Sequence, residues 1–150
     1  MIEHVWTVVC SKAVIDRETN SVSIQNVLEE LQIKGEPKSD GLVPMPVDVI
    51  SLWSRSDDNE PYEGLLRMTY VSPSGKILIT TEGRINLLEN ERSRTVIHSQ
   101  GIPIGEAGRF RFNIEHRHEA EIEWQRVASI PFTVKFSPLE VKREGVEKSE

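Results

Sequence analysis

The chain has 150 residues, of which 37% are apolar and 28% charged, and its formal net charge is −6. These values predict one soluble domain with its own core, and they argue against a nucleic-acid groove, which needs clustered Lys and Arg. No apolar run approaches the ~18–20 residues of a membrane span, so we expect neither a nucleic-acid nor a membrane partner. Cys10 is the only cysteine, which excludes an internal disulfide.

The start of the chain lacks the features of a signal peptide. Residues 1–4 carry an acid where a signal peptide needs basic residues, and the apolar run over residues 5–10 is short for a signal core. We therefore expect a cytoplasmic protein.

The first third of the chain predicts a hairpin followed by a long loop. Residues 5–15 are apolar on both parities, which indicates a strand that is buried on both faces or contains a bulge. A polar turn and a second strand at residues 21–27 follow. Residues 26–33 have helical spacing in part, but Leu31 and Ile33 also suit a strand, and we favour extended structure. Residues 35–46, rich in Gly and Pro, predict a crossover loop between two sheets.

The middle of the chain predicts strands with turns at short, regular spacing. A turn with Pro and Gly at favourable positions, at residues 72–75, joins two of these strands as a hairpin. The strands are expected at 47–53, 65–71, 77–87 and 95–102.

The central stretch, residues 109–118, alternates strictly between apolar and polar residues. Phe110, Phe112 and Ile114 share one parity, and charged residues fill the other, so we expect a strand with one face on the core. The same even parity continues to residue 136, which predicts a turn near Glu119 and a return strand. Arg126 falls on the apolar parity and indicates a bulge beside it.

These elements predict an all-β fold, an antiparallel β-sandwich of about eight or nine strands. We expect one domain over residues 1–138, and a charged, mobile C-terminal tail over residues 139–150.

Several segments resemble a family of small uncharacterised bacterial β-sandwich proteins. They are the hairpin at 5–27, the entry at 42–47, the turn at 72–76, and the strands at 108–114 and 130–134. The resemblance covers most of the chain except the tail. It implies an immunoglobulin-like sandwich, and it brings no catalytic residues with it.

His116 and His118 are the sharpest chemical feature. Residues i and i+2 of a strand face the same way, so two imidazoles could hold one transition metal, with Glu119 and His98 as further ligands. The alternative is that they only cap the apolar face where the strand reaches solvent, because such a pair is common by chance.

Other candidate sites have stronger structural interpretations. The acidic loop with Asp57, Asp58, Glu60 and Glu63 offers oxygen ligands for calcium but matches no EF-hand spacing. Cys10 lies in an apolar strand, so we predict an inert buried thiol. The three tryptophans suggest a sugar-binding platform, yet their apolar surroundings favour core packing. They are Trp6, Trp53 and Trp124.

Two functions remain open from the sequence. The first is a non-catalytic interaction module without a cofactor, which binds a protein or itself.

The stretch 95–102 has neither Lys nor Pro before Pro103 to guard a sheet edge, so it could pair with a second copy in a two-fold dimer. A monomer with this edge covered by the loop 35–46 is the competing account. The second function is a small-ligand or metal-binding domain, or a hydrolase, centred on His116 and His118.

Overall fold

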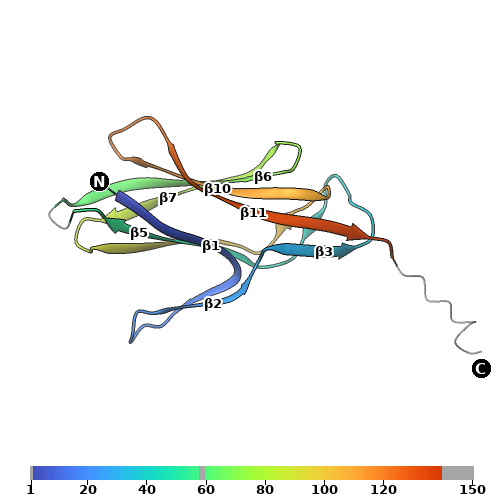
Figure 1. Ribbon diagram of the computed structural model, residues 1–150, viewed down its shortest axis with the longest axis horizontal. Helices are drawn as coiled ribbons and strands as arrows, with labels where there is room; N and C mark the ends of the chain where they lie inside the picture. Colours follow the sequence, from blue (N-terminus) through green and yellow to red (C-terminus); the bar gives the residue numbers. More distant parts are fainter. Residues whose placement is uncertain (1, 58–59, 140–150) are drawn as a thin grey trace, which may run out of the picture.

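Period-two alternation of apolar and polar residues builds two sheets that pack face to face (Figure 1). The computed structural model describes residues 2–57 and 60–139. The strands are β1 (Ile2–Ile15), β2 (Val22–Val27), β3 (Glu30–Lys34), β4 (Leu42–Val43), β5 (Val47–Arg55), β6 (Tyr62–Val71), β7 (Ile77–Leu87), β8 (Arg92–Ser99), β9 (Ile102–Pro103), β10 (Gly108–His118) and β11 (Gln125–Ser137).

The first sheet has four strands in the order β2-β1-β5-β8, and the second has five in the order β3-β11-β10-β6-β7. β4 and β9 form a separate two-stranded sheet. The all-β sandwich is therefore confirmed. The described residues form eleven strands instead of eight or nine, because β4 and β9 are two-residue strands that carry no sequence signal of their own.

One pairing departs from the antiparallel pattern. β3 pairs with β11 in parallel, from Glu30 opposite Thr133 to Lys34 opposite Ser137. The chain leaves the first sheet where the Leu28 N–H donates to the Val9 carbonyl, and it joins the second where the Glu29 carbonyl accepts from the Thr133 N–H. This change of sheet sets the direction of β3. It also confirms that residues 30–33 are extended.

The core lies between the inward faces of the two sheets. Phe110, Phe112, Ile114 and Phe132 are 3% exposed or less, as the shared parity predicts, and Ile130 packs against them from a partly buried position. The rings of Tyr70 and Phe112 have centroids 4.8 Å apart. The Tyr70 hydroxyl donates to the Pro103 carbonyl at 2.9 Å, which ties the core to the loop end of the sandwich.

A bulge on β11 takes Arg126 off the parity of the core residues. Ile114 pairs with Ala128 but the next residue of β10, Glu115, pairs with Arg126, so Val127 is the extra residue. This confirms the irregularity expected beside Arg126. A second bulge, between His4 and Trp6, interrupts β1 as its mixed parity predicts.

The hairpin of β1 and β2 extends beyond the sandwich as an arm. β1 pairs with β5 only as far as Cys10, whereas its later residues, from Lys12 to Ile15, pair only with β2. We call residues 12–25 the hairpin arm. Figure 1 shows it projecting from the body of the molecule on the side of β2.

Two predictions fall on parts of the chain outside the described residues. The tail lies there from residue 140 onward, as does Asp58 of the acidic loop. Within the described part of the chain, no helix has the length and apolar character needed to cross a membrane.

Candidate functional site

β8 is an edge strand with a regular ladder. It ends the four-stranded sheet and pairs with β5 over eight residues, from Ser99 opposite Val47 to Arg92 opposite Ser54, without a register shift. The loop 35–46 does not pair with β8. Its strand, β4, pairs with β9, where Val43 lies opposite Ile102 at the end of the stretch 95–102.

The alternating ladder determines which backbone groups of β8 are free of β5. The Arg55 N–H donates to the Glu91 carbonyl at 3.0 Å, which places this pair among the hydrogen-bonded ones. Hydrogen-bonded pairs recur at every second residue of an antiparallel ladder. The odd-numbered residues of β8 therefore bond to β5. The N–H and carbonyl groups of Arg94, Val96 and His98 consequently point toward the open side.

The open side of β8 lies next to β7 of the other sheet. A hollow of about 350 Å³ is lined by residues 81–84 of β7 and 94–98 of β8, and the two strands belong to different sheets. Val96 lies at the centre of the edge with its side chain 43% exposed on the outer face of the sheet. The edge thus combines unpaired backbone groups with one apolar contact point.

Asp48 and His98 form a polar pair next to Val96. The Asp48 side chain is buried, and its carboxylate contacts His98 Nδ1 at 2.5 Å and accepts the Ala13 N–H at 2.9 Å. The His98 side chain is 59% exposed. This pair takes His98 away from the histidine site that the sequence suggested, and it places a carboxylate beside the open edge.

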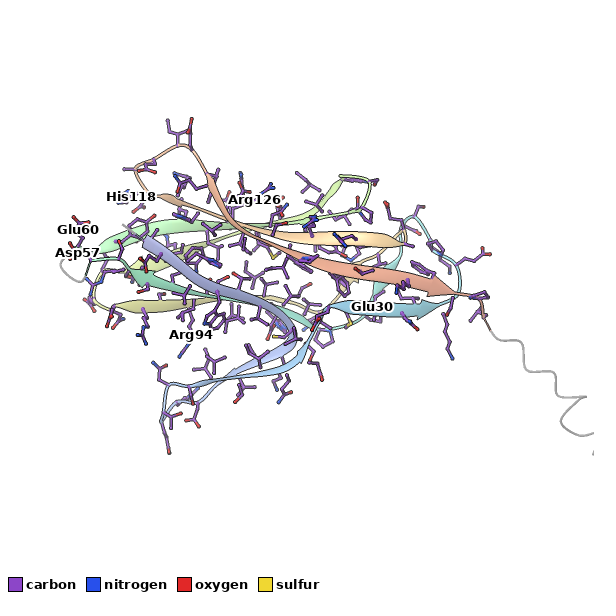
Figure 2. The ribbon with its side chains drawn as sticks, in the orientation of Figure 1. Glu30, Asp57, Glu60, Arg94, His118 and Arg126 are labelled. Carbon is purple, nitrogen blue, oxygen red and sulfur yellow. The ribbon has the colours of Figure 1, made fainter. Side chains whose placement is uncertain are left out.

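Arg94 connects the edge strand to the hairpin arm. Its guanidinium donates to Asn20 Oδ1 at 2.9 Å and to the Asn20 carbonyl. Figure 2 shows Arg94 on the same side of the molecule as the arm. A hollow of about 860 Å³ lies between the arm tip and the start of β8, with Ile15 and Leu52 among its lining residues.

His116 and His118 differ in how deeply their side chains are buried. His116 is 9% exposed, and its ring lies 5.7 Å from Trp53, whereas the exposed His118 contacts Tyr62 at 5.1 Å between ring centroids. His118 Nδ1 also accepts the Ala120 N–H at 3.1 Å. Over residues 2–57 and 60–139, no three His, Cys, Asp or Glu side chains are grouped so that they could hold a metal ion.

A second histidine that sequence reasoning missed lies close to His116. The rings of His4 and Trp53 have centroids 5.2 Å apart, and His4 Nε2 lies 2.6 Å from Thr7 Oγ1. Burial lowers the pKa of His116, against an opposing effect of Glu121. Burial and then repulsion from His116 lower the pKa of His4.

These pKa shifts predict a fold that weakens in acid. Both imidazoles have folded-state pKa values below 6.5, so the unfolded chain takes up protons at a higher pH than the folded chain. The free energy of unfolding should be fully present above about pH 6.5 and should fall as the pH drops below it. Urea unfolding at about pH 8 and about pH 5 measures this difference.

The double substitution His4→Gln with His116→Gln is expected to reduce this pH dependence. The matched control is His118→Gln, which removes an exposed ring and should leave the pH dependence in place. Equal pH dependence in the wild type and the double variant would contradict the assignment.

The three tryptophans do not share one environment. Trp53 is fully buried, as predicted, and its Nε1–H donates to Thr95 Oγ1 at 2.9 Å. Core packing is wrong for Trp124, which lies on the outer face of the five-stranded sheet, 4.5 Å from the Arg67 guanidinium and 5.0 Å from that of Arg117. The apolar parity does not continue through residues 119–124, because this segment folds over the outside of the sheet. Trp6 is half-buried.

Cys10 is fully buried, as the sequence predicts, and its thiol donates to the Asp48 carbonyl at 3.6 Å. Burial, with the nearby Asp48 carboxylate, raises the pKa of the thiol. Its inertness toward thiol reagents stays a prediction. In the acidic loop, the Glu60 N–H donates to the Asp57 carbonyl at 3.2 Å.

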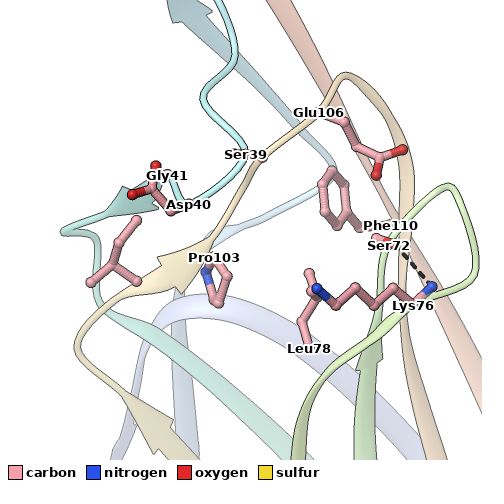
Figure 3. A pocket seen from close by; sticks show the side chains of 11 residues that line it. Ser39, Asp40, Gly41, Ser72, Lys76, Leu78, Pro103, Glu106 and Phe110 are labelled. Atoms are coloured by element: carbon pink, nitrogen blue, oxygen red, sulfur yellow. Dashed lines mark hydrogen bonds between the residues drawn. The ribbon is translucent and has the colours of Figure 1, made fainter.

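The loop end of the sandwich carries another hollow, of about 410 Å³, shown in Figure 3. Phe110 and Leu78 lie among its apolar lining, and Lys76 and Glu106 contribute charged side chains. The dashed line in Figure 3 joins Ser72 to Lys76, whose N–H donates to the Ser72 hydroxyl at 3.0 Å. This polar contact fixes the turn between β6 and β7 and does not present a reactive group.

The fold and the open edge define a β-sandwich with one exposed edge strand, β8, among the described residues. Comparisons with known proteins add little to this class. No family model and no curated protein matches the chain. The similar solved structures include two at 10% identity. They are the C-terminal domain of Wzt, with a TM-score of 0.49 over 91% of this chain and 74% of that one, and the N-terminal domain of PorA, with a TM-score of 0.33 over 87% and 97%.

Proposed function

We propose that this protein is a non-catalytic interaction module that binds a protein strand, or a second copy of itself, at the open edge of β8. The observation that carries the proposal is the eight-residue ladder of β8, which leaves alternate N–H and carbonyl groups without partners in the sheet. Adding a strand to such an edge satisfies these groups with main-chain hydrogen bonds.

The other edges of the two sheets are less suited to strand addition. β7 carries Glu82 and Arg84 on one face, and a register shift interrupts its pairing beside Val71. β3 is five residues long, and β2 belongs to the hairpin arm. Charges, bulges and short strands discourage pairing at an edge. β8 carries charges, but it contains no bulge and is eight residues long.

Further properties belong to the same proposal. We propose a bacterial, cytoplasmic protein with an immunoglobulin-like sandwich, of the uncharacterised family that its segments resemble, without an enzymatic activity or a cofactor. The net charge of −6 supports the absence of a nucleic-acid partner.

The alternative is a metal-binding or small-ligand domain, or a hydrolase, at His116 and His118. One observation favours it: His116 Nδ1 is buried and has no hydrogen-bond partner among the described residues. Metal analysis of the purified chain tests this alternative. Stoichiometric metal that is lost in His116→Gln would support it against the interaction module.

Replacing Val96 with proline tests the interaction module. The Val96 N–H points to the open side, so proline removes a donor there while the ladder with β5 persists, as edge strands allow. A labelled peptide with the sequence of residues 92–99 serves as the added strand, and fluorescence anisotropy measures its binding. We expect saturable binding to the wild type and at least a tenfold weaker affinity for Val96→Pro, a change of about 1.4 kcal/mol.

Val96→Thr is the matched control, because it keeps both the branched side chain and the N–H donor. It should retain most of the affinity for the peptide. The proposal fails if the wild type does not bind the peptide at high micromolar concentration, or if a folded Val96→Pro variant binds it equally well.

A further inference from the structure

We infer that the partner at the β8 edge is a second copy of this chain, paired antiparallel about a two-fold axis that passes beside Val96. This inference rests on the proposed function and names the occupant of the same site. Two β8 strands would then join two four-stranded sheets into one continuous sheet of eight strands. A two-fold interface of this kind uses the same surface on both copies.

The positions of the free backbone groups restrict the register. Only even-numbered residues of β8 point their N–H and carbonyl groups outward, so hydrogen-bonded pairs across the axis must join even to even residues. A register centred on Val96 meets this condition, because Val96 pairs with its own copy and Arg94 pairs with His98 of the other chain.

The side chains favour this register over one centred on Arg94. Centred on Val96, the axis brings the two half-exposed Val96 side chains against each other on the outer face. It also places Arg94 opposite His98, whose ring contacts the Asp48 carboxylate at 2.5 Å. A register centred on Arg94 would instead place two guanidinium groups opposite each other, which is unfavourable.

Arg94 is already held at the outer face. Its contacts with Asn20 of the hairpin arm fix the guanidinium beside the edge in the single chain, so less side-chain freedom is lost on pairing. The arm therefore supports the contact from within each copy.

The size of the contact predicts a weak dimer. Two eight-residue strands bury less surface than the roughly 1,200–2,000 Å² of a standard stable interface. We expect a dissociation constant in the micromolar range, with monomer and dimer in exchange.

Two measurements test the inference on the full chain. Sedimentation equilibrium should show a reversible dimer for the wild type at high micromolar concentration and a monomer for Val96→Pro. Single cysteines at residues 92, 94, 95, 96 and 97 then map the register by oxidation to disulfide-linked dimers. The native Cys10 is fully buried, so the introduced cysteine supplies the reactive thiol.

We expect the cross-linked yield to be highest for Val96→Cys. Hydrogen-bonded partners in an antiparallel pair have Cα atoms about 5.5 Å apart, within the ~4.4–6.8 Å range of disulfides. Residue 94 and its copy would be four residues out of register, roughly 13 Å apart along the strand, so Arg94→Cys is the matched negative control.

The outcomes separate this inference from the proposed function. A chain that stays monomeric but binds the 92–99 peptide overturns the self-pairing and leaves the module intact. A dimer whose cross-linking peaks at another residue overturns the Val96-centred register. A dimer without cross-linking at any of these positions, together with no peptide binding, overturns both proposals.

Discussion

Replacing Phe112 with alanine is expected to lower the free energy of unfolding by about 3–5 kcal/mol, the usual cost of emptying a buried aromatic site. Phe112 is 3% exposed and lies between Tyr70 and Phe132, with ring centroids 4.8 Å and 6.3 Å away. All three rings are buried on the inward face of the five-stranded sheet, so neighbouring side chains can fill the cavity only in part. Urea denaturation, monitored by tryptophan fluorescence, measures the loss in the free energy of unfolding.

Ile122→Ala is the matched control for this prediction. Ile122 shares the even parity of Phe112 in the sequence but is 90% exposed, so its truncation should change stability by less than about 0.5 kcal/mol. Similar losses in the two variants would contradict the placement of the core.

The difference between Phe112 and Ile122 shows which part of the fold the sequence predicts. Alternation along β10 identifies Phe110, Phe112 and Ile114 as core residues because a strand has a fixed period of two. The same rule fails for Ile122 and Trp124, since parity has no meaning once the chain leaves the strand. Trp124 then packs on arginines of the outer face, a contact that no local pattern signals.

The direction of β3 and the hairpin arm could not be predicted for a related reason. The arm begins where the pairing of β1 with β5 stops, at Cys10, and the direction of β3 depends on its pairing with β11. Both are properties of tertiary pairing. A short apolar segment such as residues 30–34 indicates a strand without indicating its partner or direction.

Of the two candidate sites, the sequence predicts the open edge but not the arrangement of the histidines. The absence of Lys and Pro from residues 95–102 points to an unguarded edge, and β8 is indeed the last strand of its sheet. The histidine pair is different, because equal parity places two side chains on one face but says nothing of depth. His116 is buried and His118 is exposed, while His4, which contacts the same Trp53 ring as His116, comes from a strand distant in the sequence.

Asp48→Ala is expected to cost about 1–3 kcal/mol of stability, because it removes the acceptor of a backbone donor. Asp48 is 5% exposed, and its carboxylate accepts the Ala13 N–H at 2.9 Å, at the point where β1 continues past the start of β5. Without this acceptor, the Ala13 N–H would lose its side-chain partner at the base of the hairpin arm. The contact with His98 adds little to this value, since the exposed imidazole can be solvated instead.

Asp48→Asn separates the hydrogen bond from the charge. The amide oxygen can still accept the Ala13 N–H, so this variant should lose less stability than Asp48→Ala even though the negative charge is gone. Urea unfolding gives the two stabilities, and hydrogen exchange at the Ala13 amide reports the contact directly. We expect fast exchange in Asp48→Ala and slow exchange in Asp48→Asn. Equal exchange in both variants would show that the base of the arm is held by its pairing with β2 alone.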